Sequence, residues 1–333
     1  MPRICLCVIA RDEAPRIARL LASVAGFVDE AVVADTGSRD GTAAIARAHG
    51  ARVIEVPWAD DFAHARNACL EAAAADWHLV LDADEWLVAG GDWLTGLGAG
   101  KAGSGFVGRV EVHNLDADTR VVSSERLSRL LLGAVRYAGC IHEQPVHQRP
   151  LRDLPLRVAH DGYSAAAMAA KRGRNRTLLR RATAEHPDDA YLWYQLGKDC
   201  AAYEDHADAE PAFARAAALM QEGRRPPWWP DLVLRWLYVL QQAGRLDEAL
   251  ALGDEQSHTL RSYPDLPFTL GNVWLDVAVR DPARAGAALA RARACWEQAL
   301  RIGERPGLEH AVAGRGSAAP RHNLGLLAMF DAG

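Results

Sequence analysis

Short apolar runs alternate with helix-like segments through the first part of the chain. The runs are 4–10, 31–34, 52–56 and 77–81, and they are rich in strand-forming residues. The segments between them carry apolar residues at helical spacing, as from Pro15 to Val24. Strand and helix alternating in this way predict an open, mostly parallel sheet with right-handed crossovers. Such a sheet binds its ligands at the carboxyl ends of its strands.

Carboxylates gather at the predicted strand ends, namely Asp12, Asp35, Asp40, Asp82 and Asp84. We expect Asp82 and Asp84 to share one face, because side-chain direction repeats every second residue along a strand. Oxygen ligands at this spacing suit Mg²⁺ or Mn²⁺, which is often shared with substrate phosphates. Asp-x-Asp alone fits an acidic turn equally well. The convergence of all five carboxylates is what favours a ligand site.

Composition narrows the class of protein. A chain of 333 residues favours two domains, each large enough for its own core. A net charge of −5 gives no reason to expect nucleic acid or an anionic membrane as partner. With no membrane-length apolar run and no signal-peptide pattern, we expect a cytoplasmic protein without a membrane span. The six cysteines form no Cys-x-x-Cys pair and are expected to be reduced core thiols.

Two common nucleotide-binding folds do not fit this sequence. No Gly-x-Gly-x-x-Gly follows the first strand, and no Gly-Lys-Ser/Thr is present. A phosphate site without a glycine cradle needs another way to neutralise the phosphates. A metal held by Asp-x-Asp supplies one.

Residues 33–42, 62–67 and 81–85 form three ordered motifs, VADTGSRDGT, FAHARN and LDADE. As a set they resemble the inverting family 2 glycosyltransferases of the GT-A fold, over roughly the first quarter of the chain. The resemblance implies a nucleotide-sugar donor and a bound Mg²⁺ or Mn²⁺. In related sequences Asn-Glu often follows the first strand, whereas this chain has Asp12 and Glu13. The base and the sugar are therefore left open.

The resemblance also implies roles for single residues. Asp35 would bind the base, Asp82 would reach the ribose or a metal-bound water, and Asp84 would ligate the metal. Arg66 and Asn67 would lie near the nucleotide. The residues expected at the nucleotide are Ala10, Arg11, Glu13, Asp35, Asp40, Arg66, Asn67, Asp82, Ala83, Asp84 and His142.

Transfer with inversion needs one carboxylate that deprotonates the acceptor as it attacks the anomeric carbon. We expect this base beyond the metal motif, and Glu143 fits best. Asp116, Asp118 and Asp161 are the rivals.

Two histidines belong to the same region, His142 in a His-Glu pair and His160 in a later His-x-Gly-Tyr. Similar sequences carry both motifs at these places. By that analogy His160 completes the metal shell, while His142 orients Glu143 or touches the donor. Each histidine could instead be a partly buried residue with a structural partner.

Between the metal motif and these histidines the pattern is weaker. Residues 90–105 are rich in glycine and predict a loop around a short turn at Trp93 and Leu94. Residues 106–112 and 120–124 predict a hairpin.

The last part of the chain is predicted to be helical only. The expected domains are a GT-A domain over 1–163, a connecting helix over 164–186 and tetratricopeptide-like repeats over 187–333. The first repeat shows bulky, small and aromatic positions at the offsets of that repeat, at Trp193, Leu196, Gly197, Ala209, Phe213 and Ala216. Two further units and a final helix near Asn323 complete a short α-solenoid. The predicted fold class is thus an α/β GT-A sheet followed by an all-α solenoid.

This arrangement resembles the bacterial peptide glycosyltransferases that modify bacteriocin precursors. The resemblance implies a UDP-sugar donor, such as UDP-glucose or UDP-N-acetylglucosamine, and a peptide Cys, Ser or Thr side chain as acceptor. It also implies that the repeats aid peptide binding and dimerisation. A cell-surface glycan or lipid acceptor is the alternative within the enzyme class. A degenerate transferase that serves as a scaffold is the alternative outside it, and a nucleotidyltransferase would want a basic, glycine-rich loop after the first strand.

Overall fold

The computed structural model describes residues 2–97, 105–116, 118–161, 173–220 and 225–331. The chain divides into two compact units, Met1–Lys171 and Arg172–Gly333. Each unit is considered by itself.

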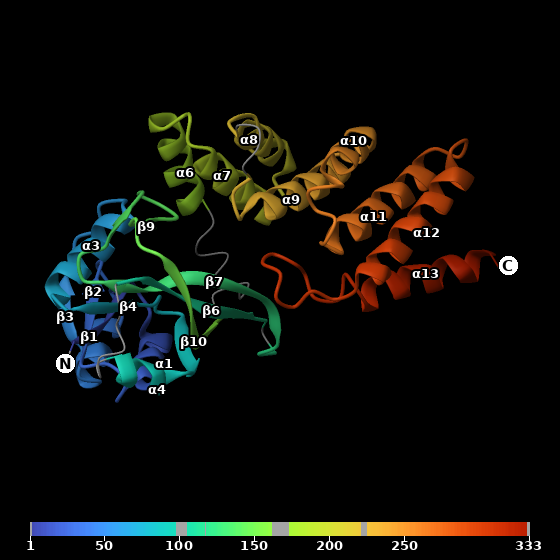
Figure 1. Cartoon of the computed structure of the whole chain (residues 1–333). Coiled ribbons are helices and arrows are strands. Elements are labelled where there is room, and N and C mark those ends of the chain that lie inside the picture. The colour runs from blue at the N-terminus through green and yellow to red at the C-terminus, as the bar shows by residue number, and fades with distance from the viewer. Residues whose placement is uncertain (1, 98–104, 117, 162–172, 221–224, 332–333) are drawn as a thin grey trace. The chain divides into compact units, whose positions relative to one another are not determined.

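Within the described residues, the first unit is built on an eight-stranded sheet of order β3-β2-β1-β4-β7-β6-β10-β5 (Figure 1). The strands of this unit are β1 (Ile4–Ala10), β2 (Glu30–Asp35), β3 (Arg52–Glu55), β4 (Trp77–Val80), β5 (Glu85–Ala89), β6 (Val107–Leu115), β7 (Val121–Leu132), β8 (Arg136–Ala138), β9 (Gln144–Val146) and β10 (Leu151–His160). β8 and β9 form a separate antiparallel pair. The predicted α/β sheet is confirmed.

The direction of the strands decides which residues meet. β1 pairs in parallel with β2 and β4, and β2 with β3. β7 runs antiparallel between β4 and β6, and β10 runs parallel to β6. β1, β2, β4, β6 and β10 therefore all end at one edge of the sheet, which we call the carboxyl edge.

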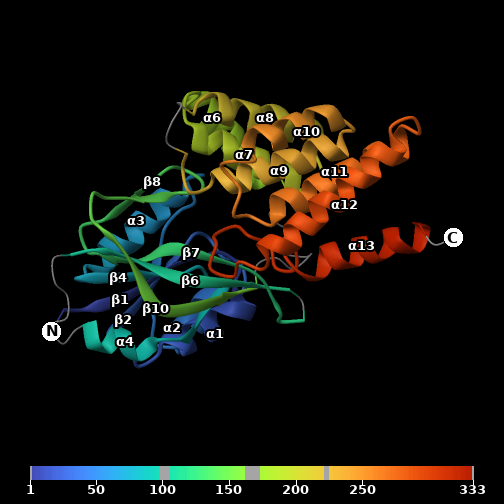
Figure 2. The ribbon, with the colours of Figure 1, turned by 45° about the vertical axis from the view of Figure 1, so that its right-hand side comes forward.

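Helices cover both faces of this sheet. They are α1 (Ala14–Val24), α2 (Thr42–Ala48), α3 (Phe62–Ala73) and α4 (Gly91–Gly96). Leu6 and Val8 of β1 lie in one core with α1, while the alternate residues Cys5 and Cys7 lie in a second core with Cys69 of α3. Figure 2 shows α3 on the opposite face from α1, α2 and α4. The cysteines of β1 are free and buried, as a core role requires.

The structure corrects three predictions for the middle of this unit. Residues 91–96 form α4, where a loop was expected, because Leu94 and Leu97 are buried at helical spacing. β7 runs to Leu132, beyond the expected 120–124, because it continues its pairing with β6 to Leu130 and its residues 130–132 pair with β4. β5 was missed because it directly follows the acidic motif. The rest of the predicted loop, 98–104, lies outside the described residues.

His78 of β4 is a buried histidine whose charge matters for stability. It is fully buried, and its Nδ1 has no hydrogen-bond partner among the described residues. Burial, with the nearby charge of Arg136, lowers the pKa of His78 from 6.5 to about 4. Between these two values the unfolded chain binds a proton that the folded chain does not. The folded state is therefore stable above pH 6.5 and loses stability as the pH falls through this window.

Replacing His78 with leucine should remove this pH dependence. From its pKa shift we expect His78 to account for a loss of roughly 2 to 3 kcal/mol in unfolding free energy between about pH 7.5 and about pH 4.5. Urea denaturation at both pH values measures this loss of unfolding free energy. The control is His49→Leu, because His49 is exposed. An equal pH-dependent loss in His78→Leu and the unmodified protein would show that another group is responsible.

The second unit has helices and connecting turns, with no strand among its described residues. Its helices are α6 (Arg174–Glu185), α7 (Ala190–Ala202), α8 (His206–Ala218), α9 (Trp229–Gln242), α10 (Leu246–Gln256), α11 (Asp265–Arg280), α12 (Ala285–Ile302) and α13 (Ala318–Asp331). The pairs α7 with α8, α9 with α10, and α11 with α12 are the three predicted repeats. Of the predicted connecting helix, α6 covers 174–185, while 164–172 lie outside the described residues.

Close approach of helices explains the glycines of the repeats. A Cβ on Gly197 of α7 would lie 2.6 Å from the ring of Phe213 in α8. A Cβ on Gly271 of α11 would likewise lie 2.4 Å from the Trp296 indole in α12. The small and aromatic positions of the repeat pattern are therefore a packing pair. None of the helices in the described ranges combines the length and apolarity that a membrane crossing requires.

Candidate active site

The loops after β1 and β2 are tied together at the carboxyl edge. The backbone N–H of Asp12 donates to Ser38 Oγ at 3.0 Å. Asp40 accepts from the backbone N–H of Ala14 at 3.1 Å and of Thr42 at 2.9 Å, at the starts of α1 and α2. Asp40 therefore holds the two loops in register, and its expected contact with a nucleotide stays a prediction.

Asp35 is the last residue of β2 and is buried. Its Oδ1 accepts from the backbone N–H groups of Gly37 and Ser38, at 3.0 and 2.7 Å. It lies beside Ala10, its register partner in β1. Arg11 follows Ala10 and is exposed. Glu13, two residues after Arg11, pairs with Arg16 at 3.1 Å.

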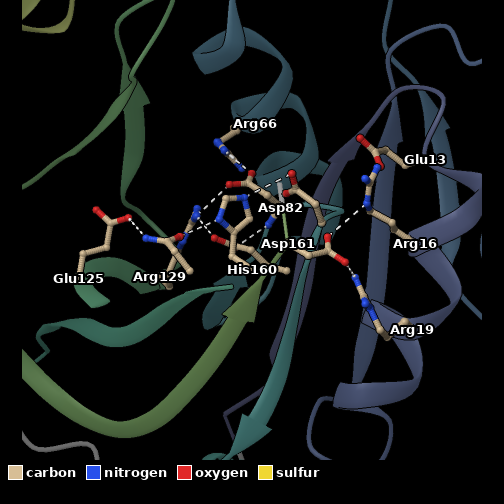
Figure 3. A network of polar contacts seen from close by, with 12 residues as sticks. Glu13, Arg16, Arg19, Arg66, Asp82, Glu125, Arg129, His160 and Asp161 are labelled. Atoms are coloured by element: carbon tan, nitrogen blue, oxygen red, sulfur yellow. Dashed lines mark hydrogen bonds and ion pairs between the residues drawn. The ribbon is translucent and has the colours of Figure 1, made fainter. Parts of the chain in front are cut away.

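Asp82 lies at the centre of a chain of ion pairs, which we call the ion-pair chain. Its members alternate in charge, in the order Glu85, Arg129, Asp82, Arg66 and Glu143. Arg66 Nη2 donates to Asp82 Oδ1 at 2.6 Å, and Arg66 Nε donates to Glu143. Arg129 Nη2 donates to Asp82 Oδ2 at 2.8 Å and to Glu85 Oε1 at 2.5 Å. Figure 3 shows Arg66 and Arg129 converging on Asp82.

Asp82 is the most exposed member of the ion-pair chain. The side chain of Asp82 is 33% exposed, whereas those of Arg66, Arg129, Glu85 and Glu143 are exposed by 9% or less. Burial alone would raise the pKa of Asp82, but the charges of the two arginines hold that pKa well below its usual range. Asp82 is thus an ionised, partly exposed carboxylate at neutral pH.

Glu85 has the opposite character. Burial raises the pKa of Glu85 to about 7, and the nearby Asp82 charge adds to the rise while Arg129 opposes it. One oxygen of Glu85 accepts from Arg129, and the other accepts from the backbone N–H of Asp82 at 2.9 Å. Two buried donor nitrogens of the ion-pair chain, Arg66 Nη1 and Arg129 Nε, have no hydrogen-bond partner among the described residues.

Asp84 lies against His160 at the end of β10. Asp84 Oδ2 is 3.4 Å from His160 Nε2, and His160 Nδ1 is 2.8 Å from Asn114 Oδ1. Asn114 of β6 is the register partner of His160. Because an amide oxygen only accepts, the Nδ1 atom carries a proton. The Nε2 atom therefore donates to Asp84 when the ring is protonated and has a lone pair for a metal when the ring is neutral. Burial lowers the pKa of His160, but the hydrogen bond and charge of Asp84 outweigh it and leave the pKa raised.

Asp84 and His160 fit a shared metal ion. A carboxylate oxygen and an imidazole nitrogen converge, and Asn114 fixes the ring from behind, as partners of metal-bound histidines do. Among the described residues no group of three or more His, Cys, Asp or Glu could hold a metal alone. An Mg²⁺ or Mn²⁺ here would therefore take its remaining ligands from water and from substrate oxygens, which suits these ions.

The prediction that Asp82 and Asp84 share a strand face is wrong. β4 ends at Val80, so residues 82–84 lie in the turn before β5, where strand alternation does not set side-chain direction. Asp82 contacts the two arginines, and Asp84 contacts His160.

Glu143 lies in the turn between β8 and β9, and Asn67 anchors that pair of strands to α3. Asn67 Nδ2 donates to the carbonyl of Tyr137 at 2.9 Å, and its Oδ1 accepts from the Tyr137 N–H at 2.8 Å. Asn67 thus positions the base candidate, and its contact with a nucleotide stays a prediction. His142 precedes Glu143 with a φ of 49°, the left-handed conformation. Ala83, which was also expected at the nucleotide, is buried.

The rival carboxylates have local partners. Asp116 Oδ1 accepts from the backbone N–H groups of Asp118 and Arg120 within the hairpin turn, and Asp118 pairs with Arg120. Asp161 pairs with Arg16 at 3.3 Å and Arg19 at 2.6 Å of α1 (Figure 3).

Sequence reasoning missed Arg129, Asn114 and Glu85. Arg129 and Asn114 are single polar residues inside strands, and no motif marks them. Glu85 was visible as the third acid after β4, and only its buried pairing with Arg129 gives it a role.

Comparison with known proteins bears on the family of the chain. The Glycosyl transferase family 2 model matches residues 5–99. A TPR repeat-containing protein of Synechococcus elongatus is 34% identical over 315 residues, covering 88% of this chain and 75% of that protein. The SPbeta prophage-derived glycosyltransferase SunS of Bacillus subtilis is 25% identical over 219 residues, covering 60% of this chain and 49% of SunS.

Among solved structures, glucosyl-3-phosphoglycerate synthase from Mycobacterium tuberculosis, in complex with Mn²⁺, UDP-glucose and glycerol 3-phosphate, is 26% identical. The match covers 34% of this chain and 44% of the synthase. Its TM-score of 0.27 is too low to bear on the fold or the site. The sequence relatives decide the family. The chain belongs to the family 2 glycosyltransferases, as a member in which tetratricopeptide repeats follow the transferase domain.

Proposed function

We propose that the protein is a metal-dependent, inverting glycosyltransferase that moves a sugar from a UDP-sugar to a Cys, Ser or Thr side chain of a peptide. UDP-glucose and UDP-N-acetylglucosamine are the proposed donors. One observation carries the metal dependence: Asp84 and His160 converge at 3.4 Å at the carboxyl edge, with Asn114 orienting the imidazole.

The residues of the carboxyl edge have separate roles in the proposed reaction. An Mg²⁺ or Mn²⁺ held by Asp84 and His160 would stabilise the charge of the leaving diphosphate. Asp82, ionised and partly exposed, would accept hydrogen bonds from the donor. Glu143 takes the proton of the attacking side chain, and its contact with Arg66 fixes where that carboxylate points. Attack from the face opposite the leaving group inverts the anomeric carbon.

The peptide acceptor is proposed from the two-domain arrangement. The chain resembles bacterial peptide glycosyltransferases in carrying helical repeats behind a family 2 domain, and the match to SunS spans 60% of it. Stacked helical repeats present extended concave surfaces that suit peptides or a second copy of the chain. A surface glycan or lipid acceptor is the alternative, and it requires no peptide contact by the repeats.

Shortening the chain to residues 1–186 tests the role of the repeats. We expect the short chain to hydrolyse the UDP-sugar slowly, as the full chain does, since the carboxyl edge lies in the first unit. Transfer to a pool of peptides containing Cys, Ser and Thr should fall about tenfold or more, the effect of losing ~1.4 kcal/mol of binding free energy.

Release of UDP and mass spectrometry of the peptides measure the two activities, and circular dichroism checks that the short chain is folded. Equal peptide transfer by the folded short chain would remove the repeats as acceptor platform. Transfer to glycan or lipid acceptors only, by the full chain, would favour the alternative.

A further inference from the structure

Arg129 lies three residues before the end of β7 and belongs to none of the motifs that the sequence displays. Its side chain is 9% exposed. A single nitrogen, Nη2, bridges Asp82 Oδ2 at 2.8 Å and Glu85 Oε1 at 2.5 Å. A buried arginine is costly to desolvate, so its place in this core calls for a reason beyond general stability.

The contacts around Asp82 give a reason for the buried arginine. Arg66 holds Oδ1, Arg129 holds Oδ2, and Glu85 holds the backbone N–H at 2.9 Å. Arg129 also binds Glu85, so it secures Asp82 directly and through its neighbour. Both carboxylate oxygens of Asp82 are thereby fixed, although this side chain is the most exposed of the ion-pair chain.

Loss of Arg129 would disturb both ends of the ion-pair chain. Glu85 and Asp82 would become neighbouring carboxylates without the cation between them, and like charges in a poorly solvated place repel strongly. Asp82 would keep only Arg66, which also holds Glu143. A shift of Asp82 therefore reaches Glu143 through Arg66.

We propose that Arg129 is a positioning residue that fixes Asp82 for the donor nucleotide and, through Arg66, fixes Glu143. This inference rests on the proposed function in taking Asp82 as a donor contact and Glu143 as the base. The competing view is that Arg129 only balances the charge of two buried acids.

A charge-neutral double variant separates the two views. R129M leaves Glu85 without its arginine and Asp82 with Arg66 alone, and we expect a lower melting temperature. R129M/E85Q removes one charge of each sign, and an amide oxygen at position 85 can still accept from the Asp82 N–H, so the melting temperature should return close to that of the unmodified protein. R126M is the matched control, because Arg126 lies on the same strand and pairs with Asp153 at the surface.

The readouts are the dissociation constant for UDP with Mn²⁺ and kcat for UDP release. We expect R129M/E85Q to bind UDP about tenfold more weakly and to lose about tenfold in kcat, each equivalent to ~1.4 kcal/mol, despite its restored stability. R129K should recover only part of both, since an ammonium lacks the planar fork of a guanidinium. R126M should match the unmodified protein.

UDP affinity and kcat within twofold of normal in the stable double variant would overturn the proposal, leaving Arg129 as charge balance. If the unmodified protein bound no nucleotide, the proposed function would fail, and a crystal structure of R129M/E85Q would then decide the positioning. Loss of the 2.6 Å contact between Asp82 and Arg66 would support it, and an unchanged Asp82 would overturn it.

Discussion

Replacing Asp84 with alanine is expected to abolish Mn²⁺-dependent binding of UDP. Asp84 Oδ2 lies 3.4 Å from His160 Nε2, and replacing it removes the carboxylate of the proposed pair of ligands. An Mg²⁺ or Mn²⁺ site with so few hard oxygen ligands does not hold these ions. We expect the UDP affinity measured with Mn²⁺ to fall at least about a hundredfold, equivalent to ~2.7 kcal/mol, to the value measured in EDTA.

The hydrogen-bond partner of His160 offers a second test, with a smaller expected effect. Asn114→Ala removes the partner that orients His160 and should weaken Mn²⁺ binding by about 10- to 100-fold, the usual effect of such partners. Asp118→Ala, at the exposed hairpin turn, is the control and should change nothing. Normal Mn²⁺-dependent UDP binding by Asp84→Ala would remove the metal assignment.

Replacing Glu143 with glutamine should leave donor binding intact and stop transfer. The amide has nearly the same shape but cannot accept the proton of the acceptor. Loss of a general base costs about 10²- to 10⁴-fold in rate, and we expect kcat to fall within that range. Calorimetry with UDP and a transfer assay on the same preparation separate binding from chemistry.

Glu71→Gln on the exposed side of α3 is the matched control for this change. Glu143 also neutralises part of Arg66, so a melting curve checks that the fold survives. Turnover of Glu143→Gln close to normal would place the base elsewhere, and Asp161 at the end of β10 would be the next residue to replace.

The parallel half of the sheet could be predicted because its strands are apolar runs, or an alternating run in β3, that are separated by helical segments. Ile4–Ala10 matches β1 in both of its bounds. The antiparallel half could not be predicted as well. β5, β8 and β9 are three to five residues long, too short for a periodic signal, and β5 pairs with β10, far away in the chain.

The candidate site likewise contains residues that the sequence could predict and residues that it could not. Its carboxylates were visible because acids that follow apolar runs stand out, and strand direction brings such ends together. The partners of those carboxylates were invisible. Arg129 and Asn114 lie in strands whose register is set by pairing between β4, β7, β6 and β10, which local sequence does not encode. The same holds for Asp82 and Asp84, because the end of β4 at Val80 decides that they lie in a turn.

Calorimetric titration of the unmodified protein with UDP, GDP and CDP, each with Mn²⁺ and with EDTA, tests most directly whether the carboxyl edge is a metal-dependent nucleotide site. We predict a micromolar dissociation constant, about −8 kcal/mol, for UDP alone among the three, and its loss in EDTA. Tight binding of GDP or CDP instead would keep the site and change the donor. No binding of any nucleotide would contradict the account and favour a scaffold, with the helical unit as the place to look for function.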